Sequence, residues 1–139
     1  MRSMPTDAEA IDFIRPSKRA VMTTRRKDGG FQTSVVTAVP RPDGKVFVWT
    51  RANTAKYHNL KRDPRCALCA VDDQWHSWVA IEATVEVVEH ADAYTLLEDY
   101  YRYREGKEHD NWAEWHRRAD EEGRHMFILT PTRVVPQIR

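Results

Sequence analysis

The chain has 139 residues, of which 41% are hydrophobic and 31% are charged, and this length has room for one globular domain, expected at residues 1–139. Lys and Arg number 22 against 21 Asp and Glu, so the net charge of +1 favours neither a nucleic acid nor an anionic membrane as a partner. No apolar run approaches the roughly 20 residues of a membrane span, and the first residues lack the apolar stretch of a signal peptide. We therefore expect a cytoplasmic protein.

The first fifty residues predict a short helix followed by strands. Thr6 and Glu9 have the spacing of a capping box, and the apolar residues after them predict a helix that ends at Pro16. Three β-rich runs follow at residues 20–24, 31–39 and 45–50, separated by turns that contain Asp-Gly or Gly-Gly. We expect a three-stranded meander, in which the third run lies antiparallel to the second.

The remaining residues alternate between helices and strands. A short helix is expected from Thr54 to Asp63-Pro64. Strands are expected at residues 66–71 and 78–89, and the second of these alternates apolar and polar side chains. Two helices, at 91–104 and 110–122, precede a last strand over 124–135 that bends at Pro131.

This order of elements predicts the fold class. Six strands joined mostly by tight turns, with helices at the start, in the middle and late, favour a mainly β (α+β) fold over a βαβ sheet. We expect a six-stranded antiparallel barrel, closed or nearly closed, because closure removes exposed strand edges.

The cysteines and histidines carry little indication of chemistry. Cys66 and Cys69 form a C-x-x-C motif, but on a strand two side chains three residues apart point to opposite faces, so we interpret them as core residues. A zinc site would need a second ligand pair, and no histidine has ligand spacing with carboxylates or cysteines. We therefore expect no metal site.

The candidate binding residues lie at the end of the third β run and in the short helix that follows. Nucleotide-binding glycine loops and the common hydrolase motifs are missing. Side chains and free helix amides at this position can converge on one phosphate group. The residues concerned are Thr50, Arg51, Thr54, Lys56 and Asn59. Alternatively, Lys56 and its basic neighbours form a solvated helix face.

Aromatic residues near these strands allow two interpretations. Trp49, Trp75 and Trp78 come from strands that bracket the candidate phosphate site. Together they can form a planar pocket for a tricyclic ring, although Trp is equally common in a barrel core.

Several short stretches are similar to one known family. The most specific is Lys56-x-x-Asn59-Leu60, followed by Asp63-Pro64-Arg65. Others are Val21-Met-Thr-Thr24, Asp28-Gly29, Gln32-Thr-Ser34, Val79-Ala-Ile-Glu82 and Asp110-Asn-Trp112. The sequence resembles the pyridoxamine 5'-phosphate oxidase-like split β-barrel superfamily and, within it, the F420-dependent reductases of the flavin/deazaflavin oxidoreductase B group.

The resemblance implies a homodimer with two cofactor sites in grooves lined by both subunits. It implies that the cofactor phosphate contacts Thr50, Arg51, Lys56 and Asn59, and that Gln32, Ser34 and Trp78 lie near the ring system. Neither a nucleic acid nor a membrane is an expected partner.

The implied activity is that of an F420-dependent reductase. Reduced F420 would deliver a hydride to an electron-poor small molecule, such as an enone, quinone, nitro compound or tetrapyrrole. Because the cofactor carries the chemistry, no catalytic side chain is identified. FMN is the alternative cofactor, and a non-catalytic module that binds flavin or haem is the alternative class of protein.

Overall fold

The computed structural model describes residues 6–17 and 19–137. Its helices are α1 (Asp7–Asp12), α2 (Ile14–Ser17), α3 (Ala55–Arg62), α4 (Tyr94–Glu105) and α5 (Trp112–Glu122), with a 3-10 turn η1 (His90–Asp92). Its strands are β1 (Arg19–Arg25), β2 (Phe31–Thr37), β3 (Val39–Pro40), β4 (Val46–Thr50), β5 (Arg65–Val71), β6 (Trp78–Val88) and β7 (His125–Gln137). No helix within the described ranges is long and apolar enough to cross a membrane.

The predicted N-terminal helix forms, but in two pieces. The capping box is confirmed, because Thr6 Oγ1 accepts a hydrogen bond from the amide of Glu9 at 3.2 Å and Glu9 Oε2 accepts one from the amide of Thr6 at 3.1 Å. Pro16 has no amide hydrogen, so the carbonyl of Asp12 lacks the donor that would continue the helix. Accordingly, α1 ends at Asp12, and α2 forms a separate turn that includes Pro16.

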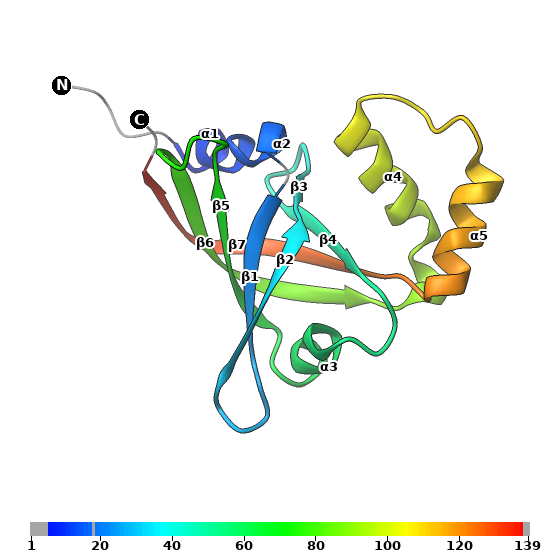
Figure 1. The fold of residues 1–139 in the computed structure, drawn as a ribbon, viewed down its shortest axis with the longest axis horizontal. Helices are drawn as coiled ribbons and strands as arrows, with labels where there is room; N and C mark the ends of the chain where they lie inside the picture. The colour runs from blue at the N-terminus through cyan, green and yellow to red at the C-terminus, as the bar shows by residue number, and fades with distance from the viewer. Residues whose placement is uncertain (1–5, 18, 138–139) are drawn as a thin grey trace.

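The strands form one antiparallel sheet in the order β2-β1-β5-β6-β7-β4-β3. Its two outermost strands, β2 and β3, are joined through Ala38 alone, so the sheet must curl round on itself (Figure 1). The described residues thus form the predicted split β-barrel, with seven strands rather than six.

The seventh strand arises because the β run at 31–39 divides at Ala38. Residues before it pair with β1, whereas Val39 and Pro40 pair with β4. The first half of the predicted meander is confirmed, because β1 and β2 form an antiparallel hairpin. The second half is wrong for β2, which diverges from β4, and β4 takes β3 and β7 as its ladder partners. This divergence is the split in the barrel.

Two apolar clusters hold the fold together. The first fills the barrel with side chains such as Met22, Leu68 and Phe127. The second lies between the barrel and the late helices and includes Phe47, Leu97, Tyr100, Trp115 and Met126. Each fully buried large side chain of this kind contributes roughly 1.5–3 kcal/mol of transfer free energy.

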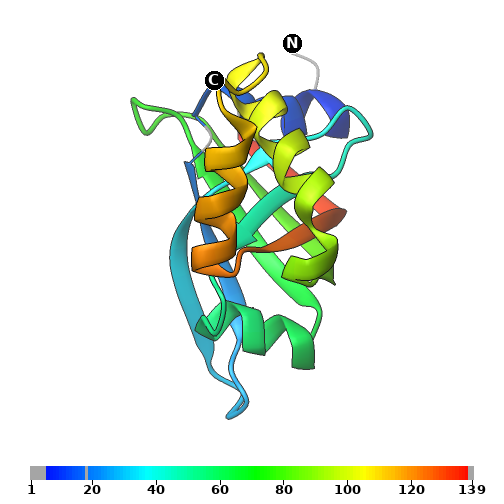
Figure 2. The same ribbon diagram turned by 90° about the vertical axis from the view of Figure 1, so that its right-hand side faces the viewer.

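Helices cover three sides of the barrel. The α4–α5 pair lies over β4 and the start of β7 (Figure 2), which explains why Val46, Phe47 and Val48 are all fully buried rather than alternating. In Figure 1, α1 and α2 lie at one end of the barrel and α3 lies at the other.

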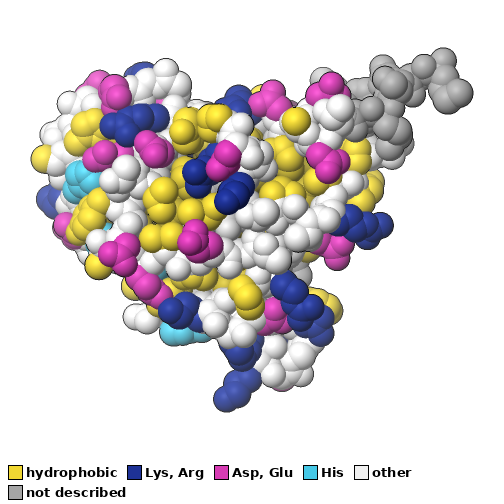
Figure 3. Space-filling model, turned by 180° about the vertical axis from the view of Figure 1, so that it is seen from behind, with side chains coloured by type: hydrophobic (Ala, Val, Ile, Leu, Met, Phe, Trp, Pro, Cys, Tyr) yellow, Lys and Arg dark blue, Asp and Glu magenta, His cyan; other side chains and the backbone are white. Residues whose placement is uncertain are grey.

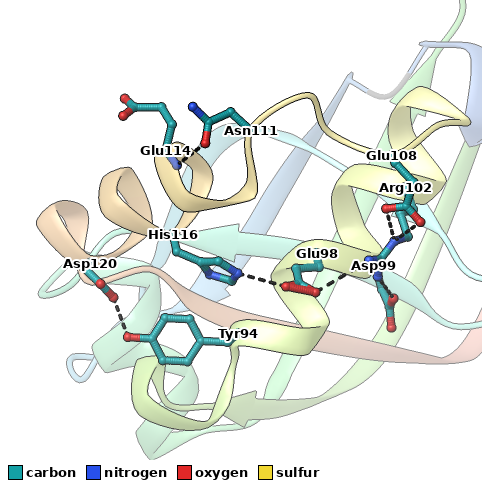
Figure 4. Close-up of polar contacts among 9 residues, drawn as sticks. All are labelled: Tyr94, Glu98, Asp99, Arg102, Glu108, Asn111, Glu114, His116 and Asp120. Carbon is teal, nitrogen blue, oxygen red and sulfur yellow. Dashed lines mark hydrogen bonds and ion pairs between the residues drawn. The ribbon is translucent and has the colours of Figure 1, made fainter.

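Polar contacts join α4 to α5 (Figure 4). His116 Nε2 lies 2.9 Å from Glu98 Oε1, and the Tyr94 hydroxyl donates to Asp120 at 2.5 Å. Asn111 caps α5 by accepting a hydrogen bond from the amide of Glu114 at 3.1 Å. The pair is therefore a defined helical hairpin rather than two loosely attached segments.

The cysteines are free and face opposite sides of β5, as predicted. Cys66 is buried in the barrel core, where burial raises the pKa of its thiol to about 12. A thiol with such a pKa is protonated at neutral pH and is a poor nucleophile. Cys69 is half-buried on the other face, so the interpretation of both cysteines as core residues is wrong for Cys69.

Candidate functional site

A cleft of about 270 Å³ lies in the split between β2 and β4. The beginning of α3 and one face of α4 complete its walls. Its lining residues are Val35, Val36, Thr37, Trp49, Thr50, Arg51, Thr54, Lys56, Tyr100 and Arg104. Four of the predicted phosphate-site residues, namely Thr50, Arg51, Thr54 and Lys56, are thus brought together in one cleft.

The beginning of α3 is fixed by Thr54. Its side chain accepts a hydrogen bond from the amide of Tyr57 at 3.3 Å, and its Oγ1 lies 2.7 Å from Thr50 Oγ1. The amides of Ala55 and Lys56 have no hydrogen-bond partner within the described ranges. A helix N-terminus with unsatisfied amides favours an anion.

Lys56 is the most informative residue of the cleft. Its side chain is half-buried, and among the described residues it has neither a carboxylate nor a hydrogen-bond partner. Burial lowers the pKa of this lysine, because a desolvated ammonium group loses the water that stabilises its charge. An anion bound beside Lys56 would restore that stabilisation.

The cleft as a whole is positively charged. Arg51, Lys56 and Arg104 line it, and no Asp or Glu is among its described lining residues. Arg51 Nη2 lies 3.6 Å from Glu122 Oε1, and Arg104 Nε donates to Glu105 Oε1 at 2.8 Å. A guanidinium carries five N–H donors, so neither of these contacts occupies the whole group.

Asn59 lies on the buried face of α3 and is not among the described lining residues of the cleft. Its Nδ2 donates to Thr24 Oγ1 at 3.1 Å, and its Oδ1 accepts from Arg62 Nη2 at 3.3 Å. The buried amide therefore ties α3 to β1. Its predicted contact with a cofactor phosphate stays a prediction.

Of the three residues predicted near a ring system, two lie on the strand that borders the cleft and one lies far from it. Gln32 and Ser34 lie on the same face of β2 as Val36, which lines the cleft. The Ser34 hydroxyl is buried and has no hydrogen-bond partner among the described residues. Trp78 is remote from the cleft, because its ladder neighbours are Val71 and Gln137.

The predicted tryptophan pocket is not formed within one chain. Trp49 lines the cleft, whereas Trp75 lies in the turn between β5 and β6 and is 80% exposed. The intervening strands β1 and β5 separate β2 from β6, which carries Trp78. The three tryptophans are close to the same elements in the sequence, but the sequence does not tell which face of the sheet each side chain occupies.

An apolar surface lies on the outer face of the sheet, next to the cleft. Val21, Phe31, Val35 and Trp75 are exposed there, with Val35 at 77%. A second hollow of about 330 Å³ includes Val21, Val35 and Trp75 among its lining residues. Because Val35 borders both hollows, a molecule covering this surface would reach the edge of the cleft.

Basic side chains gather at the end of the molecule where the β1–β2 turn projects (Figure 3). The exposed basic residues at the end of β1, in the β1–β2 turn, in α3 and in β5 are Arg25, Arg26, Lys27, Lys61, Arg62 and Arg65. Several are engaged, since Lys61 pairs with Glu89 and Arg65 pairs with Asp63.

Tyr100 and Arg104 were not predicted as site residues. They come from α4, some fifty residues after Thr50 in the chain. Their four-residue spacing places them on one helix face, which was the only sequence signal available.

The fold and the cleft define the class of protein, a split β-barrel with a positively charged cleft. A family model for pyridoxamine 5'-phosphate oxidase matches residues 6–137. The chain therefore belongs to the pyridoxamine 5'-phosphate oxidase family, and it has the fold of an oxidoreductase.

Solved structures share this fold. A conserved hypothetical protein from Mycobacterium tuberculosis is 23% identical, with a TM-score of 0.77 over 97% of this chain and 86% of the other. An F420 reductase is 17% identical, with a TM-score of 0.69 and coverage of 95% and 98%. General stress protein 26 from Bacillus anthracis is 13% identical, with a TM-score of 0.68 and coverage of 94% and 92%. No curated protein matches the chain.

Proposed function

We propose that this protein is an F420-dependent reductase of the cytoplasm whose cleft between β2 and β4 binds the phosphate of the cofactor. The observation that carries the proposal is Lys56, a half-buried cation without a partner among the described residues, at the beginning of a helix with free amides. Its surroundings fit a phosphate, since they offer hydroxyl, amide and cationic donors and no described carboxylate.

The chain's own residues would then bind and orient. Thr50, Thr54 and Lys56 hold the phosphate together with the amides of Ala55 and Lys56, while Arg51 stands beside it. Gln32 and Ser34 continue along β2 towards the ring. Reduced F420, when bound, supplies a hydride for an electron-poor acceptor such as an enone, quinone, nitro compound or tetrapyrrole.

FMN is the alternative cofactor, because it carries the same kind of ring and a ribityl phosphate. F420 adds an anionic oligoglutamate tail, which favours basic residues beyond the phosphate. Arg51 is 68% exposed beside the cleft and suits this role, and the structural likeness to an F420 reductase supports the same choice. The resemblance to the flavin/deazaflavin oxidoreductase B group points in the same direction.

We further propose that the protein is a homodimer whose partner covers the apolar outer face. Large exposed apolar side chains such as Val21, Phe31 and Trp75 are unfavourable in water and typical of an interface. Val35 links this face to the cleft, so the cofactor site would lie at the interface. Trp78 lies on the outer side of β6, so its predicted contact with the ring requires the dimer.

The test is a parallel titration of the protein with F420 and FMN at fixed salt, following cofactor fluorescence. Micromolar or tighter binding of F420, with much weaker binding of FMN, is expected, followed by turnover of reduced F420 with an acceptor panel. Tighter binding of FMN than of F420 would assign FMN as the cofactor in place of F420. Binding without turnover would favour the non-catalytic module, and binding of neither cofactor would refute the proposal.

A further inference from the structure

Tyr100 carries a buried polar group without a hydrogen-bond partner in the part of the chain that the structure describes. The residue is fully buried, yet it lines the cleft. Its hydroxyl lies near Thr37, Trp49 and Arg104, but no described residue makes a hydrogen bond of acceptable geometry with it. A buried hydroxyl without a partner destabilises a protein, and a ligand that accepts its hydrogen bond would remove this cost.

The chemistry of this hydroxyl suits an anion. Burial raises the pKa of Tyr100, so at neutral pH the side chain is a neutral phenol with a proton to donate. A phosphate oxygen is a strong acceptor, and a hydrogen bond to a charged group is stronger than one to a neutral group.

Arg104 lies one helical turn further along α4 and lines the same cleft. Its guanidinium carbon lies 5.4 Å from the ring centroids of both Tyr100 and Tyr101, and its side chain is 26% exposed. Stacking on aromatic rings reduces the number of conformations available to the arginine, which prepares it to bind.

We propose that Tyr100 and Arg104 are further phosphate-binding residues, so that α4 forms one wall of the binding site and Lys56 with α3 forms the other. The ligand would be a flavin-type cofactor with a phosphate group, and in this respect the inference rests on the proposed function. The helical hairpin thereby has a role in binding, in addition to covering β4 and β7.

Contacts at the other end of the hairpin support this arrangement. The amide of Ala52 donates to the carbonyl of Glu122 at 3.0 Å, and Arg51 approaches the Glu122 carboxylate at 3.6 Å. The segment that carries the phosphate-site residues is therefore attached to α5 as well as to the barrel. A ligand bound between α3 and α4 would therefore connect the segment before α3 with the helical hairpin, which already contact each other through Glu122.

The test uses Tyr100→Phe and Arg104→Met, with Tyr103→Phe as the control that removes a hydroxyl from the same helix. Kd is measured for FMN and for riboflavin, which lacks the phosphate, and for F420 and its phosphate-free chromophore. Both variants should weaken the phosphate-bearing ligands about tenfold and leave the phosphate-free ligands unchanged. The free Tyr100→Phe protein should keep or raise its Tm, because it loses an unpartnered buried hydroxyl.

Equal losses for both members of a ligand pair, or unchanged affinity in both variants, would overturn the inference. A lowered Tm of Tyr100→Phe with unchanged affinity would do the same, because it would assign the hydroxyl a structural role.

Inorganic pyrophosphate, tested by thermal shift, separates this inference from the proposed function. If the wild-type protein binds no flavin but gains stability from pyrophosphate in a Tyr100-dependent manner, the phosphate site stands and the cofactor assignment fails. If Lys56→Met weakens cofactor binding and the α4 variants do not, only the present inference fails.

Discussion

Lys56 shows how one residue can be unfavourable for the free protein and favourable for binding. Its pKa lies below the ordinary value of 10.5 because the half-buried ammonium group is desolvated. The unfolded chain therefore binds a proton more tightly at this position than the folded protein does. Stability due to Lys56 rises as pH increases from the lowered pKa towards 10.5, since the folded protein then no longer carries a desolvated charge.

Titration of the same lysine should make ligand affinity fall with rising pH, whereas its contribution to stability rises. A phosphate ligand needs the charged form, so affinity should be constant near neutral pH and should fall as pH rises through the lowered pKa of Lys56. Titrations of FMN or F420 from pH 7 to the ordinary lysine pKa of 10.5 measure this, with Lys56→Met as the control that should lack the fall. Identical pH profiles of affinity for the wild-type protein and Lys56→Met over this range would remove Lys56 from the phosphate contact.

His125 predicts sensitivity to acid. Its ring stacks on Tyr57 with centroids 4.1 Å apart, and its Nδ1 accepts a hydrogen bond from the amide of His90 at 3.0 Å. Protonation of Nδ1 would remove that bond. Burial lowers the pKa of His125 below 6.5, and nearby Glu89 only partly opposes this effect.

Stability due to His125 is therefore present above pH 6.5 and lost as pH falls through its lowered pKa. Thermal unfolding from pH 7.5 to pH 4.5 should show a falling Tm, and His125→Asn, which keeps an acceptor near Nδ1 but does not titrate, should show a smaller fall. Identical slopes for the two proteins would assign the acid sensitivity to other groups.

Gly123, at the end of α5, connects the hairpin to the cleft. It has a φ of +59°, and a Cβ at this position would lie 2.9 Å from the Cβ of Ala52. A side chain here would therefore push the segment that carries Arg51. Gly106, at the end of α4, has a similar φ of +72°, but a Cβ there would meet no atom of the described residues within 4 Å, so this glycine provides a matched control.

Gly123→Ala and Gly106→Ala should each lower the free energy of unfolding by about 1–2 kcal/mol, because an L-residue is disfavoured in the left-handed conformation. Only Gly123→Ala should also weaken cofactor binding, through displacement of Ala52. Chemical denaturation and a titration of each variant measure the two effects. Equal binding by both variants would mean that the attachment of Ala52 to α5 does not position the site.

At the level of elements, the sequence predicts what is local. The capping box at Thr6 and the start of α3 at Thr54 depend on neighbouring residues and are confirmed. The division of one β run at Ala38 was missed, because strand pairing is decided by distant residues that leave no trace in the run itself. The candidate site residues that lie within one segment of the chain could be identified from the sequence. Tyr100 and Arg104 could be identified only from the tertiary structure.

The whole molecule presents an apolar face that predicts self-association. Val21→Glu places a charge on the outer face of β1, away from the described lining of the cleft. We expect this variant to be a monomer with weakened cofactor binding, because a charge buried without a partner opposes an apolar interface. Ala113→Glu adds the same charge at an exposed position of α5 and should leave the dimer intact.

Sedimentation at micromolar concentration measures the mass of the wild-type protein and both variants. A wild-type monomer, or a Val21→Glu dimer that binds cofactor normally, would contradict the dimer and its interfacial site. For the whole molecule, the family resemblance predicted the fold correctly, but it did not indicate that α4 contributes residues to the cleft.

The measurement that tests the central claim most directly is the Kd of the preferred cofactor for the wild-type protein and Lys56→Met, with Tm of the free proteins measured alongside. We expect Lys56→Met to bind at least tenfold more weakly, since a charge-assisted contact contributes roughly 1.5–3 kcal/mol, while its Tm stays equal or rises. Unchanged affinity in a folded Lys56→Met protein would contradict the assignment of the cleft as the phosphate site.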